Sequence, residues 1–360
     1  MAGAATQLRW LQALTDLPTA PGEEQAVQRW VRAWARRRGM RVRADAAGNL
    51  LLSVGSRSRR RPVVAVAHLD HPALVVTSGG VDPVAHLRGG VLPEYLPGRA
   101  VEVLVPAGPV TARISAFDPA SGRAELSLRR RVAVDKGSIV RWHFAPASLG
   151  VRDGRLRARA CDDLAGAAAA LAALDRAGAS GLGHFSVLLT RAEEVGLIGA
   201  IAACDLETLP RSARVLSIEC SRSSADAALG AGPIVRVGDA SSVFSAGLTN
   251  RIAALARAAG ITHQRKLMAG GTCEATAFAA LGYEATGLCV ALASYHNMVD
   301  IDGVRAGRGP ARLAPEEISL SDFNRLVALL VMVAADIDTT PEDLVRRLRR
   351  RYRTERSILG

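Results

Sequence analysis

The segment TRAEEVGLIGA, from Thr190 to Ala200, places two adjacent carboxylates, Glu193 and Glu194, between an apolar run and a glycine. The run, FSVLLT, has the pattern of a strand buried on both faces of a sheet. On a solvated helix, a doubled acid would carry no functional meaning. At the carboxyl end of a buried strand, one acid can bind a metal ion while the other accepts a proton. Both interpretations are open from this segment alone.

The composition of the 360-residue chain is that of a folded protein with one large domain or two smaller ones. A hydrophobic fraction of 49% and a charged fraction of 22% allow a sizeable core and argue against disorder. No apolar run reaches the ~18 residues that span a bilayer, and the N-terminus lacks the pattern of a signal peptide. We therefore expect a cytoplasmic protein with no membrane partner. Five widely spaced cysteines without a CxxC motif indicate buried free thiols.

A net charge of +12 raises the question of nucleic-acid binding. Nearly all the basic residues are arginines, and aromatic residues make up only 4% of the chain, too few for a base-stacking surface. The basic clusters, RSRRRP at 57–62 and RRLRRRYR at 346–353, fall at a turn and near the C-terminus. We expect them to form solvated surface or a subunit contact, and nucleic acid is not the expected partner.

The larger part of the chain alternates between helical and strand patterns. Helical spacing is present at 5–16 and 22–38, and RPVVAVAHLD at 61–70 has the pattern of a strand buried in a parallel sheet. This alternation predicts an α/β fold with a mostly parallel sheet flanked by helices. Further helices are expected at 162–177, 244–259, 274–281 and 315–337, and further strands at 184–190, 214–219 and 285–292.

Between about 77 and 157 the pattern changes to short β-type runs, such as VEVLVPAG and RAELSLRR, separated by Gly, Pro and Asp. Helical periodicity is absent there. The sequence thus predicts a small all-β domain at 77–157, inserted into a discontinuous catalytic domain formed by 1–76 and 158–360.

Acidic and imidazole side chains occur at the ends of the expected apolar strands or beside helix starts. Taken singly, each has a structural explanation: an N-cap, a solvated helix face or a loop histidine. Together they are placed where a parallel sheet gathers ligands, at the carboxyl ends of its strands. The group consists of His68 and Asp70 in AVAHLDHPA, Asp162 and Asp163 in RACDDLAG, Glu193 and Glu194, Glu219 in LSIECSR, and His296 in SYHNM.

Imidazole and carboxylate ligands suit zinc, cobalt or manganese. Two histidines and three carboxylates are enough for two divalent metal ions if one carboxylate bridges them, and such pairs activate a shared water. A further carboxylate must then accept the proton of that water. On this reading Glu194 binds a metal and Glu193 faces the water. Asp70 can accept the second N–H of the His68 ring and so orient it.

The order of these motifs resembles the tetrahedral aminopeptidase family of co-catalytic metallopeptidases, which includes glutamyl and deblocking aminopeptidases. HxD is followed by Asp-Asp, then Glu-Glu-x-Gly-Leu, an acid that closes a strand, and a late histidine. Other similar segments are TDLPTAPGEEQAVQRWV, YLPGRAVEVL, LGAGPIVRVGDASSVFS and AGGTCEATAFAALGYEATGLCVAL. The insertion lies between His68 and Asp162, as in this family. The related carboxypeptidase and deacylase group has its extra domain after the Glu-Glu pair.

The resemblance implies a peptide substrate, a homo-oligomer (dimer or dodecamer) and a role for each motif residue. His68, Asp162 and Glu219 would bind one ion, and Asp162, Glu194 and His296 would bind the other, with Asp162 bridging the two. Glu193 would act as the general base and then as the proton donor, and Asp70 would orient His68. Asp163 would brace the bridge through an unusual peptide geometry, and His71 would be a substrate contact or an extra donor.

Glu219 supports an alternative. The tetrahedral family usually has Asp at this position, and Glu resembles the carboxypeptidase and deacylase branch. A metal-dependent carboxypeptidase or N-acyl-amino-acid deacylase is therefore the second hypothesis. A catalytically silent basic scaffold that uses the arginine-rich tail is the non-enzymatic one. The sequence favours the aminopeptidase.

Overall fold

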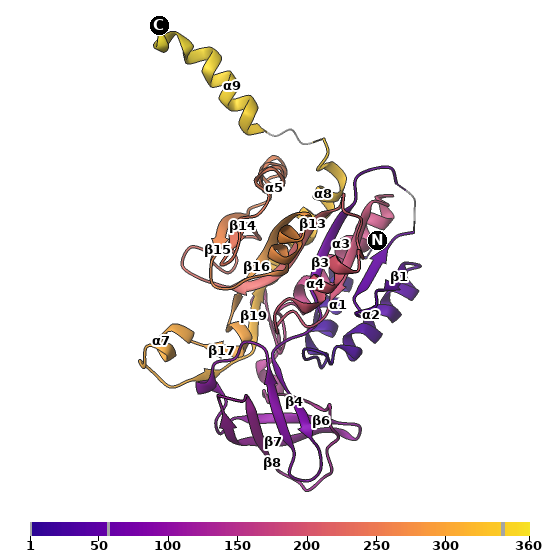
Figure 1. Cartoon of the computed structure of the whole chain (residues 1–360), viewed down its shortest axis with the longest axis vertical. Helices are drawn as coiled ribbons and strands as arrows, with labels where there is room; N and C mark the ends of the chain where they lie inside the picture. The colour runs from indigo at the N-terminus through magenta and orange to yellow at the C-terminus, as the bar shows by residue number, and fades with distance from the viewer. Residues whose placement is uncertain (1, 56–57, 340–342) are drawn as a thin grey trace.

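The fold is built on an eleven-stranded sheet, with helices against both faces and a small β-barrel beside it (Figure 1). The structure, a computed structural model, describes residues 2–55, 58–339 and 343–360. Arg57, the first arginine of the basic cluster at 57–62, lies outside these residues. The predicted α/β fold class is confirmed.

The four central strands of the sheet, β12, β3, β13 and β16, run parallel to one another. Strand β3 has the sequence VVAVAH and is buried throughout, as expected for a parallel strand covered on both faces. Antiparallel strands extend the sheet on both sides. In order, the strands are β1 (Arg41–Ala44), β2 (Leu50–Ser53), β12 (Phe185–Thr190), β3 (Val63–His68), β13 (Arg214–Arg222), β16 (Glu284–Ala293), β19 (Glu316–Ser319), β11 (Arg155–Ala158) and β10 (Gly150–Arg152), with β14 (Ile234–Asp239) beside β16 and β15 (Gln264–Met268) beside β14.

The two faces of the sheet pack into separate cores. Because side chains alternate along a strand, Val63 and Ala65 of β3 enter the larger core while Val64 and Val66 enter the smaller one. The larger core contains α1 (Ala4–Asp16), α2 (Gln25–Arg37), α3 (Leu164–Ala179), α5 (Ala246–Ala258) and α8 (Leu320–Asp336), and the smaller core contains α4 (Ile198–Asp205) and α6 (Glu274–Ala280).

The start of the last long helix differs from the prediction. Helix α8 begins at Leu320, whereas a helix over 315–337 was expected, because 316–319 form strand β19 between β11 and β16. The Ser319 hydroxyl accepts a hydrogen bond from the Asp322 N–H and caps the helix. The segment therefore supplies both a strand and a helix cap.

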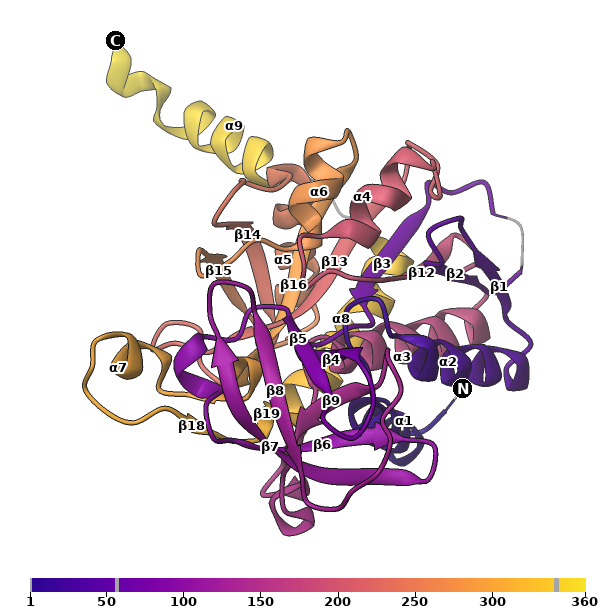
Figure 2. The same ribbon diagram turned by 60° about the horizontal axis from the view of Figure 1, so that its bottom comes forward.

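The residues between β3 and α3 form a closed six-stranded barrel, which lies in front of the sheet in Figure 2. Its core includes Val101, Val103 and Ile114. After the last barrel strand the chain returns to the large sheet through β10 and β11. The barrel strands are β4 (Ala73–Ser78), β5 (Val84–Arg88), β6 (Ala100–Val105), β7 (Gly108–Asp118), β8 (Arg123–Leu128) and β9 (Ile139–Trp142), with the short helices η1 (Pro93–Tyr95) and η2 (Pro146–Ser148) nearby.

A second set of short elements joins the barrel to the sheet. Met298 and Ile301 belong to the barrel core, and the Tyr95 hydroxyl donates to the Val299 carbonyl at 2.6 Å. These contacts fix the segment after β16 against the barrel. Its elements are η3 (Tyr295–Asn297), β17 (Met298–Val299), α7 (Ile301–Arg305) and β18 (Arg312–Leu313).

The chain ends in a helix, α9 (Asp343–Glu355), followed by η4 (Arg356–Leu359), which project away from the rest of the molecule (Figure 1). Within the described residues, no helix combines the length and apolar character needed to cross a bilayer. All five cysteines are free and buried.

We expect the alanine-rich packing of α3 to be the most sensitive part of the larger core. Leu171 is fully buried, so Leu171→Ala should leave a cavity and lower the free energy of unfolding by about 3 kcal/mol. Leu206→Ala is the matched control, because Leu206 is 46% exposed and should cost less than about 0.5 kcal/mol. Urea denaturation would measure both. Equal losses would show that α3 is not packed as described.

Candidate metal centre

His68 is the last residue of β3 and points its Nε2 atom into a group of acids at the carboxyl edge of the parallel strands. Its Nδ1 atom lies 3.1 Å from the Asp70 carbonyl and 3.6 Å from the Asp70 carboxylate. The Asp70 carbonyl can accept a hydrogen bond from Nδ1–H, while the Asp70 carboxylate lies at ion-pair distance. This arrangement leaves Nε2 free to bind a cation.

His296 lies opposite, in the turn after β16, and is held in the same way. Its Nδ1 atom lies 2.9 Å from the carbonyl oxygen of Gly90, in the loop between β5 and η1. The ring stacks on Tyr295 at 3.7 Å between centroids. The inserted barrel thus helps to direct Nε2 of His296 toward the acids.

Asp162 stands between the two histidines. Its Oδ1 atom is 3.6 Å from Nε2 of His68, and its Oδ2 atom is 3.6 Å from Nε2 of His296. Only 3% of the residue is exposed. One carboxylate therefore faces both imidazoles, the arrangement that a bridging ligand requires.

Three glutamates complete two groups of ligand atoms. His68 Nε2 lies 3.9 Å from Glu193 Oε2 and 4.0 Å from Glu219 Oε2. His296 Nε2 lies 3.1 Å from Glu194 Oε1. His68, Glu193 and Glu219 could hold one ion, and Asp162, Glu194 and His296 a second. The structure thus brings the five predicted ligands together and places Glu193 beside them.

These distances suit divalent cations. Two ligands that are each about 2.1 Å from a tetrahedral ion lie about 3.4 Å apart. Buried polar atoms normally have hydrogen-bond partners, yet several here have none. They are Asp162 Oδ1, Glu194 Oε1, Glu219 Oε1 and His296 Nε2. Cations would satisfy all four atoms, so the residues present fit a two-metal centre.

The electrostatics of the group lead to the same conclusion. Burial raises the pKa of Glu219 to about 8, and it raises the pKa of Glu193 well above its usual value. Burial opposes the charging of His296, but Glu194 and Asp162 outweigh it and raise the pKa of that imidazole. Buried acids outnumber the imidazoles that could neutralise them. Metal binding would displace these protons and balance the remaining negative charge.

Asp70 connects His68 to the doubled acid. Its two carboxylate oxygens accept the main-chain N–H groups of Glu193 and Glu194, each at 3.0 Å. The turn is also held by Glu24, a buried acid from the start of α2, which accepts the Ala192 N–H at 3.1 Å. Asp70 therefore positions both glutamates as well as contacting the ring.

Asp163 and His71 lie next to Asp162. The Asp162–Asp163 peptide bond is cis, and Asp163 is fully buried at the N-terminus of α3. A Cβ atom on Gly166 would come within 2.1 Å of Asp163 Oδ1, so this position requires glycine. His71 contacts the Asp162 carbonyl through Nδ1 at 2.7 Å and Asn297 Oδ1 through Nε2 at 3.2 Å.

Glu316 is a functional candidate that the sequence analysis missed. Its Oε2 atom accepts the N–H groups of Cys161 at 2.6 Å and Asp162 at 3.0 Å, while Oε1 accepts the His296 N–H at 2.9 Å. One buried carboxylate thus joins the backbones of two candidate ligands. The available signal was a second doubled acid, Glu316-Glu317, at the start of a buried strand.

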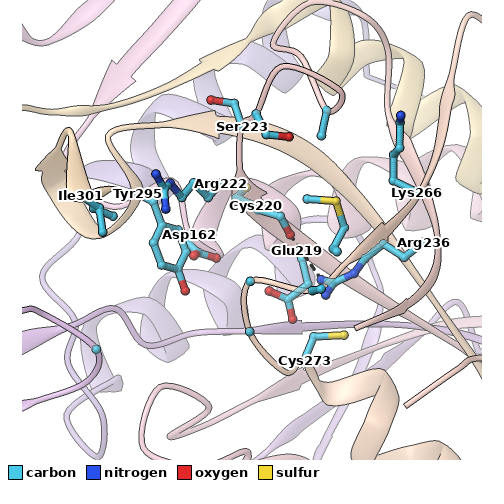
Figure 3. Close-up of a pocket in the computed structure, with 18 of the residues that line it drawn as sticks. Asp162, Glu219, Cys220, Arg222, Ser223, Arg236, Lys266, Cys273, Tyr295 and Ile301 are labelled. Carbon is cyan, nitrogen blue, oxygen red and sulfur yellow. Dashed lines mark hydrogen bonds between the residues drawn. The ribbon is translucent and has the colours of Figure 1, made fainter. Parts of the chain in front are cut away.

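A cavity of about 530 Å³ opens beside Asp162 and Glu219. Figure 3 shows the guanidinium of Arg236 next to the Glu219 carboxylate, with Lys266 and Arg222 farther along the wall. Arg236 is only 3% exposed and its Nε atom makes no hydrogen bond. The cavity is also lined by two further acids and four bases. The acids are Asp226 and Asp302, and the bases are Arg222, Arg236, Lys266 and Arg305.

Comparisons with known proteins identify a family and a shared fold. The family model of the M42 glutamyl aminopeptidases matches residues 128–307. A comparison of the sequence with curated proteins finds no match.

Among solved structures, archaeal aminopeptidases share the fold. A TET aminopeptidase from a marine sediment archaeon of the Thaumarchaeota has a TM-score of 0.76 and 19% identity, covering 93% of this chain and 100% of the other. The TET1 peptidase of Pyrococcus horikoshii, which can assemble into a tetrahedron or a large octahedral shell, has a TM-score of 0.74 and 21% identity, covering 92% and 99%. An aminopeptidase from Desulfurococcus kamchatkensis has a TM-score of 0.73 and 19% identity, covering 94% and 98%.

Glu316→Gln should weaken divalent-metal binding by about 10- to 100-fold. In the wild type the Glu316 carboxylate accepts main-chain N–H groups, whereas the amide NH₂ of glutamine would face one of these donors and could not accept its hydrogen bond. Competition with a chelating dye would measure the affinity for zinc. Glu317→Gln is the matched control, since Glu317 pairs with Arg155 and Arg157 instead. Unchanged zinc affinity in Glu316→Gln would show that Glu316 does not contribute to metal binding.

Proposed function

The chain belongs to the M42 glutamyl aminopeptidase family and is therefore a metallo-aminopeptidase, and we propose that it removes N-terminal residues from peptides at the centre described above. The observation that carries this proposal is the Asp162 carboxylate, which faces His68 and His296 through different oxygens at equal distances of 3.6 Å. Two-metal peptide hydrolysis needs a ligand in this position.

We assign the ligands as follows. His68, Asp162 and Glu219 hold one divalent ion, and Asp162, Glu194 and His296 hold the other. Imidazole and carboxylate donors at these separations favour zinc, with cobalt or manganese as alternatives. Glu193 lies close enough to His68 to serve as a further ligand, but we assign it a different role.

Glu193 is the proposed proton carrier. Bound divalent ions supply Lewis-acid polarisation of the scissile carbonyl and acidify water. The Glu193 carboxylate accepts a proton from the attacking water and returns it to the leaving amine. Asp70 holds the main chain of Glu193 at 3.0 Å, so the acid is positioned by its backbone while its side chain stays free to transfer the proton.

The cavity favours an acidic residue at the N-terminus of the substrate. Four basic side chains line it, and two of them are neutralised, Arg222 by Asp302 and Lys266 by Asp226. Arg236 is buried with an unsatisfied Nε, and a substrate carboxylate would satisfy it. The family description, glutamyl aminopeptidase, names the same substrate class.

We further propose a homo-oligomeric assembly, by analogy with the shells formed by the Pyrococcus horikoshii relative. The division into a catalytic domain, 1–76 and 158–360, and an inserted domain, 77–157, belongs to this proposal, with the barrel supplying the contact from Gly90 to His296.

Glu193→Gln should keep both metal ions and lower kcat at least about a hundredfold, because the amide cannot accept a proton. Metal content would be measured by mass spectrometry of the purified protein, and turnover with glutamyl-nitroanilide. Glu207→Gln, an exposed change on the neighbouring helix end, is the control. Loss of one ion would instead make Glu193 a ligand, and full activity would refute its role in proton transfer.

Arg236→Gln should lower kcat/KM for glutamyl-nitroanilide by about 10- to 100-fold and affect leucyl-nitroanilide much less, since a charge-assisted hydrogen bond is lost only with the acidic substrate. Arg222→Gln, at the cavity rim, is the matched control. Equal losses of kcat/KM on both substrates would contradict a substrate contact and would indicate that Arg236 instead balances the charge of Glu219.

N-acyl amino acids added to the same substrate panel test the second hypothesis. Glu219 is the residue that motivates a carboxypeptidase or deacylase. Hydrolysis of N-acyl amino acids in preference to aminoacyl-nitroanilides would favour that alternative. A protein with no bound metal and no hydrolysis would favour the silent scaffold.

A further inference from the structure

The C-terminal helix α9 carries a dense positive charge that the proposed function does not use. From Leu344 to Gly360, all the residues are exposed, and the segment contains seven arginines against one acid, Glu355. The helix projects away from the sheet and the barrel (Figure 1). The arginines are Arg346, Arg347, Arg349, Arg350, Arg351, Arg353 and Arg356.

The same helix has an apolar stripe. Leu344, Leu348 and Tyr352 follow one another at four-residue intervals, so they lie on one face, with Val345 beside them. Leu344, Leu348 and Tyr352 are 42%, 58% and 60% exposed. In η4, Ile358 and Leu359 add exposed apolar surface, at 77% and 80%. Arginines flank the stripe on both sides and share the polar face with Thr354, while Glu355 lies at the C-terminal end of the stripe.

The combination limits what can cover this face. Two copies of α9 packed through their stripes would bring the flanking arginines of both helices together, and these like charges repel. A nucleic acid would pair with the arginines but leave the leucines and the valine in water. The covering surface has to be anionic and also able to take up apolar side chains.

We propose that α9 binds the surface of an anionic lipid bilayer. A basic amphipathic helix lies in the plane of the interface, with its apolar residues at the boundary of the acyl chains and its cations among the phosphates. Arginine suits this role because its planar guanidinium binds phosphate oxygens in pairs. Tyr352 has the apolar ring and polar tip that favour the headgroup region. This surface binding needs no membrane-spanning segment.

Flotation of the full-length protein with vesicles tests the proposal. The wild type should float with vesicles of 30% phosphatidylglycerol in phosphatidylcholine and stay in solution with pure phosphatidylcholine. Leu348→Ser with Tyr352→Ser should lower the vesicle-bound fraction at least tenfold at unchanged net charge. Arg349→Ser with Arg350→Ser, a matched pair of changes on the polar face, should also lower it and weaken its dependence on salt.

Peptidase activity without lipid should be the same in all these proteins, because α9 lies outside the proposed centre, and this readout excludes misfolding. The proposal is overturned if the wild type does not float with the anionic vesicles. It is also overturned if the Leu348 and Tyr352 changes leave flotation intact, because the arginines alone would then account for binding to the anionic vesicles, without the apolar stripe. A change of oligomeric state in that variant without lipid would assign the stripe to another subunit and equally reject the bilayer.

Discussion

The centre depends on the placement of one carboxylate, that of Asp162, between two imidazoles that arrive from distant parts of the chain. His68 ends a buried parallel strand, and His296 follows another, so the parallel arrangement of β3, β13 and β16 brings both to one edge of the sheet. Asp162 reaches the same edge only after the chain has completed the barrel and returned through β11. Three buried carboxylates, Asp70, Glu316 and Asp163, then surround the ligands.

The surroundings of this centre are strongly acidic for a protein interior. Buried carboxylates avoid ionisation unless partners compensate for the lost hydration. Here the main-chain N–H groups that donate to Asp70 and Glu316 compensate for some of it. Four unsatisfied atoms, on Asp162, Glu194, Glu219 and His296, belong to the candidate ligands, and bound cations would satisfy them. Acidic side chains and backbone N–H groups thus form one electrostatic unit, which bound cations would complete.

The central strands and their terminal acids could be predicted because a continuous apolar run such as VVAVAH leaves little alternative to a buried parallel strand. The role of Glu316 could not, because its partners are backbone groups of Cys161, Asp162 and His296, which only the tertiary structure brings near. The sequence likewise predicts a helix where strand β19 forms at 316–319, because four residues show no clear period. The contact from Gly90 to His296 depends on the barrel's position, which local sequence patterns do not encode.

Glu316 has a consequence for the order in which the protein becomes active. During translation His68 is synthesised first, Asp162 follows after the barrel, and His296 is synthesised much later. The carboxylate that fastens Asp162 and His296 together belongs to β19, twenty residues beyond that histidine. A growing polypeptide therefore has no complete centre until β19 has left the ribosome.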